Sequence, residues 1–360
     1  MKHGKTFEEL AAELYRRKEM KHDYVVDTSV LTMDASPNNA LMSIRNDTTN
    51  QTYLFNINEI AHNQIGTKLG IPAKYYDKMR VENPELLAQN VNSWFKLYPE
   101  KRMVRTLDGT IRAFLTDKYR RIDNFEIMAA VYPIIKEMPD ANIESCEVTD
   151  ERLYLKVVNP RLTTDVVPGD TVQSGILITN SEVGLGSFTV SPLVYRLVCS
   201  NGMVINDAKT RKYHVGRANA ASEDYSIYSD ETVRADDRAL MLKFQDMVRA
   251  VVDRVKFEAV VDKMRRAKGA EITTSNIPAM VELAGSDFGY SLQEASGILD
   301  CLIRGEDLTL YGFANATTQF AQTVQSYDRS TQLESIGYNI MTMSNAKWNK
   351  LQNASVGDAA

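Results

Sequence analysis

SEVGLGSFTVSPLVYRLVCSNGM, residues 181–203, is the stretch that decides the fold class. A glycine-bearing turn at residues 183–186 leads into a long β-rich run that closes on Asn201-Gly202. Asn-Gly is the strongest short-range signal of a β-hairpin, because both residues tolerate positive φ. A basic and aromatic segment follows at once, with Lys209, Arg211, Lys212, Tyr213, His214 and Arg217. The pattern predicts a β-ribbon that brings positive charge and aromatic rings to one edge of the fold. It favours binding of a polyanion over catalysis.

Further hairpins are predicted on the N-terminal side of this stretch. Two strands flank Asp108-Gly109, and two more flank the polar loop at residues 46–50. From residue 239 onward, apolar residues recur at helical spacing. We therefore expect an α+β fold, with an antiparallel, β-hairpin-rich N-terminal domain followed by a helical C-terminal region. The expected boundaries are 1–219 for the first domain, 220–238 for a polar, acidic linker, 239–345 for the helices and 346–360 for a flexible tail.

Composition limits the functional classes. The chain has 360 residues, of which 44% are hydrophobic and 25% charged, as in an ordinary soluble protein. A net charge of -5 excludes a protein that coats nucleic acid with a surface that is basic throughout, but it is compatible with a local basic patch. No apolar run approaches the roughly 20 residues that span a membrane, and the N-terminus lacks a signal-peptide apolar region. We expect a cytoplasmic protein that does not contact membranes.

The residues that usually carry chemistry do not form a recognisable site. Three widely spaced cysteines, Cys146, Cys199 and Cys301, indicate buried thiols in a reducing compartment. The four histidines lack metal-ligand spacing, and Gly184-x-Gly186 lacks the phosphate-loop and dinucleotide patterns. Ser181 lies outside a nucleophile-elbow context. We expect no enzyme activity, no catalytic residue, no metal and no cofactor.

A second basic cluster lies between residues 101 and 121. Arg105 and Arg112 occupy the two strands of the predicted Asp108-Gly109 hairpin, where they can project near each other. Arginine forks suit phosphate oxygens, and an exposed tyrosine can stack on a base. The alternative is a charged hairpin edge that prevents aggregation. The residues of this cluster assigned to nucleic-acid binding are Arg105, Arg112, Lys118, Tyr119, Arg120 and Arg121.

Several blocks together resemble a phage- and plasmid-borne family, the domain of unknown function 932. One block is residues 112–119 with Ile122-Asp123-Asn124. Another runs from Thr179-Asn180-Ser181-Glu182-Val183-Gly184 to residues 195–203, and the third combines residues 315–318, 328–329 and 333–337. The resemblance spans roughly residues 20 to 345. It implies a setting in mobile genetic elements and no particular activity or site residue.

The leading functional hypothesis is a phage or plasmid DNA-metabolism protein that binds single-stranded DNA, with ATP-independent strand annealing in recombination as one use. Such a protein acts as a homo-oligomer, and the apolar residues of the last helices, among them Phe313, Leu333 and Ile340, are candidates for subunit contacts. The same residues can instead pack on their own domain. The alternative function is a protein-interaction module, such as a virion component or an inhibitor of host defence, whose partner is a host protein.

Overall fold

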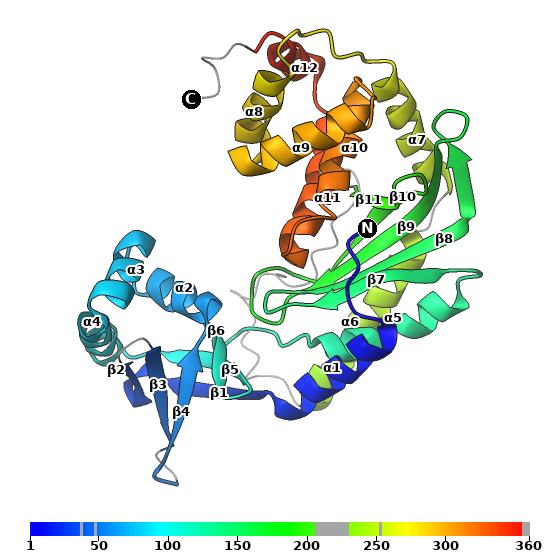
Figure 1. The fold of residues 1–360 in the computed structure, drawn as a ribbon. Coiled ribbons are helices and arrows are strands. Elements are labelled where there is room, and N and C mark those ends of the chain that lie inside the picture. Colours follow the sequence, from blue (N-terminus) through cyan, green and yellow to red (C-terminus); the bar gives the residue numbers. More distant parts are fainter. Residues whose placement is uncertain (37–38, 47–48, 206–229, 252–253, 355–360) are drawn as a thin grey trace.

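A computed structural model describes residues 1–36, 39–46, 49–205, 230–251 and 254–354. The architecture is α+β, as the sequence predicted: a β-rich N-terminal part with antiparallel strands precedes a helical C-terminal part. The described strands form two separate sheets, which lie in different parts of the molecule (Figure 1). The predicted N-terminal domain therefore contains two β-layers, each with its own helices.

The first sheet has six strands in the order β1-β5-β6-β4-β3-β2. Its strands are β1 (His22–Asp27), β2 (Leu31–Ser36), β3 (Asn39–Asn46), β4 (Gln51–Ile57), β5 (Lys101–Leu107) and β6 (Thr110–Thr116), with a short 3-10 turn, η1 (Thr28–Val30), between β1 and β2. All pairs are antiparallel except β4 with β6. Asp108 and Gly109 join β5 to β6 with φ of 49° and 72°, so this predicted hairpin is confirmed.

Helices α2 (Glu59–Lys68), α3 (Ala73–Glu82) and α4 (Pro84–Leu97) pack on one face of the first sheet (Figure 1). Met42, Phe114 and Val91 lie in their shared core and are at most 4% exposed. Asn58 caps α2 by accepting a hydrogen bond from the backbone N–H of Ala61, a common role for asparagine at a helix N-terminus. Tyr76 from α3 is buried against α2, where its hydroxyl lies 2.9 Å from Nδ1 of His62.

Burial of His62 makes part of the stability depend on pH. Its ring is 5% exposed, and desolvation, with the charge of Arg80, lowers the pKa of His62 from 6.5 to about 4. The unfolded chain therefore binds a proton more readily between pH 6.5 and 4, and stability falls by about 1.4 kcal/mol per pH unit as the pH drops through this window. Urea unfolding of the wild type and of His62→Gln at pH 7 and pH 4.5 will show a smaller loss in the variant. An equal loss in both proteins would contradict this assignment.

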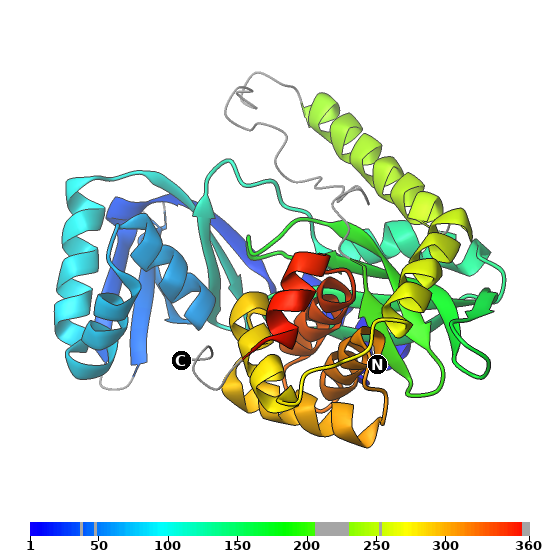
Figure 2. The ribbon, with the colours of Figure 1, turned by 90° about the horizontal axis from the view of Figure 1, so that it is seen from above.

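The second sheet is an antiparallel meander in the order β11-β10-β9-β8-β7. Its strands are β7 (Asn142–Val148), β8 (Leu153–Asp165), β9 (Thr171–Asn180), β10 (Thr189–Arg196) and β11 (Asn201–Val204). Helices α1 (Phe7–Met20), α5 (Asn124–Glu137) and α6 (Asp230–Val251) pack on one face and share a core that includes Leu10, Ile127 and Phe244. Figure 2 shows α6 on the side of this sheet away from the C-terminal helices.

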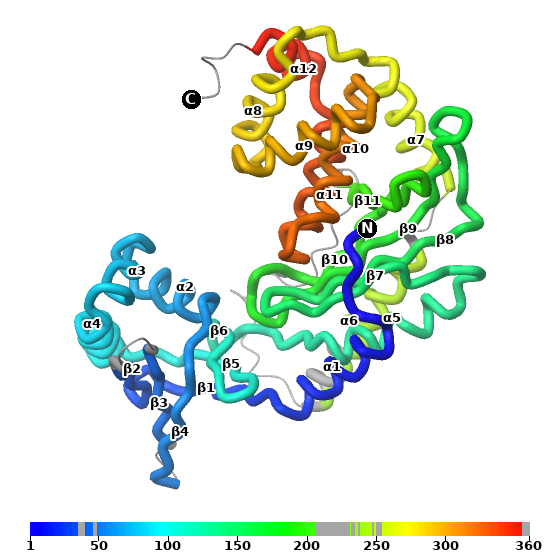
Figure 3. Tube along the Cα trace, viewed as in Figure 1, coloured from blue at the N-terminus to red at the C-terminus, as the bar shows by residue number. Residues whose placement is uncertain are grey.

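The remaining helices form the C-terminal part. They are α7 (Arg254–Lys268), α8 (Ile277–Phe288), α9 (Leu292–Arg304), α10 (Leu310–Phe320), α11 (Tyr327–Met341) and α12 (Asn345–Gln352). Their core is continuous with residues of β9 to β11, such as Val172 and Val194. The chain start runs between this part and the second sheet (Figure 3), where Lys2 Nζ donates to the carbonyl of Val324.

Polar contacts also fasten these helices to the second sheet. Lys156 of β8 pairs with Glu334 of α11 at 2.7 Å, and both side chains are at most 1% exposed. The hydroxyl of Tyr311 donates to Asp170, just before β9, at 2.9 Å. Phe313, Leu333 and Ile340, the candidates for subunit contacts, are 0% exposed within this core. These three side chains therefore fit the alternative expectation, that the last helices pack on their own domain.

The β10–β11 hairpin exists, but its turn is not at Asn201-Gly202. Arg196 pairs with Asn201, so the turn is formed by residues 197–200, and Ser200 carries the positive φ of 50°. Gly202 lies within β11, where an added Cβ would come within 2.6 Å of the Met1 side chain. This glycine permits close packing and does not make a turn. Cys199, expected to be a buried thiol, lies in this turn and is half-buried.

Two predicted boundaries also need correction. Residues 230–238, expected in the linker, form the start of α6; residues 220–229 lie outside the described residues. Residues 345–352, most of them expected in a flexible tail, form α12 because Ser344 caps the helix and Trp348 and Leu351 are buried. No helix in the described ranges is long and apolar enough to cross a bilayer.

Candidate nucleic-acid interface

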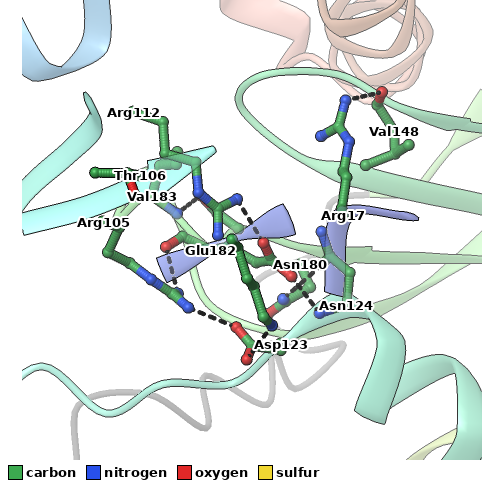
Figure 4. A network of polar contacts seen from close by, with 12 residues as sticks. Arg17, Arg105, Thr106, Arg112, Asp123, Asn124, Val148, Asn180, Glu182 and Val183 are labelled. Atoms are coloured by element: carbon green, nitrogen blue, oxygen red, sulfur yellow. Dashed lines mark hydrogen bonds and ion pairs between the residues drawn. The ribbon is translucent and has the colours of Figure 1, made fainter. Parts of the chain in front are cut away.

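The β5–β6 hairpin carries the first basic cluster, and a β-bulge sets the direction of its arginines. Arg105 pairs with Ala113 and Thr106 pairs with Ile111, which leaves Arg112 as the extra residue on β6. A bulge re-aims the side chain of the inserted residue. Arg105 and Arg112 consequently converge on Glu182, which follows β9 of the other sheet (Figure 4). The predicted proximity of the two arginines is present, and it serves a contact between the two sheets.

Arg105 is fully surrounded by protein acceptors. Its Nε and Nη2 atoms donate to Asp23 at 2.8 and 3.1 Å, Nη2 also donates to Asp123 at 2.7 Å, and Nη1 donates to the carbonyl of Glu182 at 2.9 Å. The side chain is 0% exposed. Burial opposes the charge of Arg105, but Asp123 and Asp23 outweigh it and raise the pKa of the guanidinium.

Asp123 is held ionised in the same contact. Burial alone would raise the pKa of its carboxyl group, but the charges of Arg105 and Lys21 outweigh burial and lower it. Lys21 forms an ion pair with Asp123 directly after α1. Removing Arg105 would take the guanidinium away from both Asp23 and Asp123, whose side chains are 11% and 14% exposed, and would leave buried negative charge poorly compensated.

Arg112 and Glu182 form the second half of the contact. Arg112 Nη1 donates to Glu182 Oε2 at 2.5 Å, and the backbone N–H of Asn124, the first residue of α5, donates to Oε1 at 2.6 Å. The Glu182 carboxylate therefore accepts from a helix N-terminus, where negative charge is stabilised. Asn180 Nδ2 donates to the side chain of Asn124 at 2.8 Å. We call this network the inter-sheet junction; it comprises Asp23, Arg105, Arg112, Asp123, Asn124, Asn180 and Glu182.

Tyr119 lies at the edge of the inter-sheet junction. Its hydroxyl donates to the carbonyl of Ser181 at 3.2 Å, and burial raises the pKa of its phenol. Arg105 and Arg112 have inward-facing side chains in the junction, so we assign them a structural role and leave them out of the interface proposed below. Whether Tyr119 stacks on a base stays a prediction.

The other members of the first cluster lie nearer the surface. Lys118 is exposed and has no ion pair among the described residues. The Arg121 side chain is 54% exposed and lies 3.7 Å from Asp23. Arg120 forms an ion pair with Asp236 of α6 at 2.8 Å. Three positive charges thus follow β6 within four residues, and one of them contacts the helix that begins after residue 229.

The second cluster, Lys209, Arg211, Lys212, Tyr213, His214 and Arg217, lies outside the described residues. In sequence it lies between the end of β11 at Val204 and the start of α6 at Asp230. Because Asp236 contacts Arg120, the early part of α6 lies beside the first cluster. That the two clusters form one surface stays a prediction.

Sequence reasoning missed an exposed aromatic pair at the end of α4. The rings of Trp94 and Tyr98 are stacked, with centroids 5.8 Å apart and planes at 13°. The two residues are 40% and 68% exposed. Lys96, within the pair, and Lys101, at the start of β5, are exposed as well. The segment SWFKLYPEK, residues 93–101, contained the signal: two large aromatic residues four apart, with lysines around them.

A pocket of about 530 Å³ lies elsewhere, between the chain start, α5 and β7. Its lining combines Lys5 and Lys136 with Glu8 and Glu144, so its charge selects neither an anion nor a cation. Within the ranges that the structure describes, no three His, Cys, Asp or Glu side chains gather as a metal-binding group.

The family described as Domain of unknown function (DUF932) matches residues 113–351, about two thirds of the chain. The chain therefore belongs to this family, as its sequence blocks indicated. The matched span begins inside β6 and includes Glu182 and the C-terminal helices, while β1 to β5 and α2 to α4 precede it. No curated protein and no solved structure matches the chain.

Proposed function

We propose that this member of the DUF932 family binds single-stranded DNA, as a cytoplasmic DNA-metabolism protein of a phage or plasmid. The interface consists of Lys118, Arg120 and Arg121 after β6, Lys101 at the same end of the hairpin, and the segment from Lys209 to Arg217. Arg102 pairs with Thr116 across the hairpin, so Lys101 and Lys118 both lie next to this last strand pair.

The observation that carries the proposal is that the lysines near this end of the hairpin are exposed and have no carboxylate partner within the described part of the chain. Many cations elsewhere have close carboxylate partners, as in Arg16–Asp108 at 2.8 Å and Arg80–Glu59 at 2.8 Å. Lys96, Lys101 and Lys118 are exposed, and the described residues provide none of them with an ion pair. Exposed cations without a protein counterion can neutralise phosphates and displace the counterions condensed on the nucleic acid, and the release of these ions favours binding. A local patch suffices, although the net charge is -5.

Removing charge from the interface will weaken binding and reduce its salt dependence. We expect each lost phosphate contact to lower the slope of log affinity against log salt by about 0.7 for a single strand. Lys118→Gln with Arg121→Gln will therefore reduce the slope by about 1.4. The set Lys209→Gln, Arg211→Gln, Lys212→Gln and Arg217→Gln will reduce it by up to about 2.8. Fluorescence anisotropy with a labelled 30-nucleotide strand at several salt concentrations measures the slope.

The matched control is Lys78→Gln. Lys78 is an exposed lysine of α3 that lies 3.7 Å from Glu82 and outside the proposed interface. We expect it to leave both affinity and slope unchanged. If both interface sets bind the single strand like the wild type, the proposed interface is disproved.

Strand annealing by a homo-oligomer is the specific activity that we propose. Mass photometry will detect the oligomer, and the pairing of two complementary labelled strands without ATP will report annealing. Subunit contacts must use surfaces other than the residues of α10 and α11 that are buried in the core, such as Phe313 and Ile340. A monomer that binds strands without pairing them would leave DNA binding intact and exclude annealing.

A further inference from the structure

The outer face of α4 ends in two aromatic residues, Trp94 and Tyr98, that remain partly exposed to solvent. Phe95 is 2% exposed and stacks on Phe114 of the sheet at 5.7 Å. Trp94, its neighbour in sequence, is 40% exposed, and Tyr98 at the helix C-terminus is 68% exposed. The helix therefore uses one aromatic residue for the core and presents the next to solvent. Leu97, between them, is 62% exposed.

The geometry of the pair suits a flat ligand. Ring planes at 13° and centroids 5.8 Å apart make Trp94 and Tyr98 nearly parallel. Aromatic faces of this kind stack on nucleobases in proteins that bind single strands. In a duplex the base faces are hidden by neighbouring pairs, so an external platform selects unpaired bases. The other chemistry that an apolar patch accepts, an apolar protein surface, does not require the positive charge that surrounds this pair.

The charges around the pair complement a phosphate backbone. Lys96 and Lys101 lie within three residues of Tyr98, and both are exposed without an ion pair among the residues described. Glu100, the nearest acid in sequence, is already paired with Lys68 at 2.9 Å and Arg102 at 2.7 Å. Asp27 faces Lys101 across the sheet, and its carboxylate accepts hydrogen bonds from Ser29. Asp27 keeps its negative charge, but the two lysines, together with Lys68 and Arg102 beside Glu100, leave a local positive charge.

The platform is also continuous with the proposed interface. The hydroxyl of Thr28 donates to the carbonyl of Phe95 at 3.2 Å, and its backbone N–H donates to the carbonyl of Glu100 at 2.9 Å, which holds the end of α4 and the start of β5 against the first sheet. Lys101 then begins β5, and Lys118 lies at the same end of the hairpin. A strand that contacts Lys118 and Lys101 can therefore continue toward Tyr98.

We propose that Trp94 and Tyr98 form a stacking platform for the unpaired bases of single-stranded DNA, with Lys96 and Lys101 on the adjacent phosphates. This inference rests on the proposed function and names where the bases bind. Stacking is worth about 1–3 kcal/mol per base, or a factor of about 5 to 150 in affinity. Replacing both rings removes at least one such contact.

The test compares four proteins with three probes. The proteins are the wild type, Trp94→Ala with Tyr98→Ala, Trp94→Phe with Tyr98→Phe, and Leu97→Ala as an exposed apolar control on the same helix. The probes are a 30-nucleotide thymidine strand, an abasic strand of equal length, and a 30-base-pair duplex. We expect the double alanine variant to bind the thymidine strand at least about fivefold more weakly. The double phenylalanine variant and Leu97→Ala should remain close to the wild type, and binding of the abasic strand should be equal in all four.

A direct readout of stacking is available from tryptophan fluorescence. The chain contains two tryptophans, Trp94 and Trp348, and Trp348 is 9% exposed in the C-terminal core. In a Trp348→Phe background, the thymidine strand should quench Trp94 emission and the abasic strand should not. This readout does not depend on the alanine variants remaining folded.

The outcomes separate the two proposals. If the wild type binds no strand at any salt concentration, the proposed function fails, and the platform fails with it. If the wild type binds the thymidine strand with a steep salt dependence, but the double alanine variant binds equally well and Trp94 emission is unchanged, only the platform is disproved. Equal loss of thymidine and abasic binding in the double alanine variant would also disprove it, because the rings would then act on the fold and not on bases.

Discussion

Glu182→Ala is expected to lower the free energy of unfolding by about 3–5 kcal/mol. Glu182 is 6% exposed and accepts hydrogen bonds from Arg112 and from the first backbone N–H of α5. Two Arg112 nitrogens, Nε and Nη2, are already buried without a hydrogen-bond partner. Removal of the carboxylate would leave this guanidinium buried with no counterion. Urea unfolding at pH 7, followed by circular dichroism, measures the change.

The control for this prediction is an exposed pair of the same chemistry. Arg161 lies 2.6 Å from Asp140, and their side chains are 61% and 62% exposed. We expect Arg161→Ala to change the free energy of unfolding by at most about 1 kcal/mol, because water and salt screen such pairs. A Glu182→Ala variant as stable as Arg161→Ala would show that the inter-sheet junction does not hold the two sheets together.

Truncation after Ala270 is expected to abolish soluble expression of the folded protein. The deletion removes α8 to α12, whose apolar side chains share a core with Val172, Val194 and Met203 of the second sheet. It also leaves Lys156, 0% exposed in the full chain, without its partner Glu334. Soluble yield and the size-exclusion profile of the truncated chain test this.

A milder variant keeps the prediction measurable if the truncated chain is lost to aggregation. Phe313 is 0% exposed, and replacing it with alanine leaves a cavity, which typically costs about 3–5 kcal/mol. Phe320, on the same helix but only partly buried, is the matched comparison and should cost less. A truncated chain that is soluble, folded and monomeric would mean that these helices serve self-association.

Local signals in the sequence located many of the elements. Asp108-Gly109 marked its hairpin correctly, because both residues adopt the positive φ that the turn requires. The same logic misplaced the turn at Asn201-Gly202. Position 202 requires glycine because the Met1 side chain packs against it, and no local pattern reveals a contact across 201 positions of sequence. Trp348 and Leu351 likewise pack in a core built from residues distant in sequence, so the sequence alone led to the prediction of a flexible tail for their segment.

The candidate site shows the same limit. Positive charge at Arg105 and Arg112 is visible in the sequence, but the acids that meet these arginines come from positions 23, 123 and 182. Whether a cation is buried with a carboxylate or faces water is decided by these distant partners. Exposure of Trp94 and burial of Phe95, adjacent residues of similar character, depend on the orientation of α4 on the first sheet.

The central claim is that this protein binds single-stranded DNA through an exposed basic edge. The most direct test measures the affinity of the wild type for a single strand and for the corresponding duplex across a salt series. Anisotropy titrations with the 30-nucleotide strand and the 30-base-pair duplex from 50 to 300 mM salt supply it. We predict tighter binding of the strand at every salt concentration, with a log–log slope of about -3 to -5, as expected for four to seven phosphate contacts at about 0.7 each. No binding of the strand at 50 mM salt, or an affinity that does not change with salt, would contradict the claim.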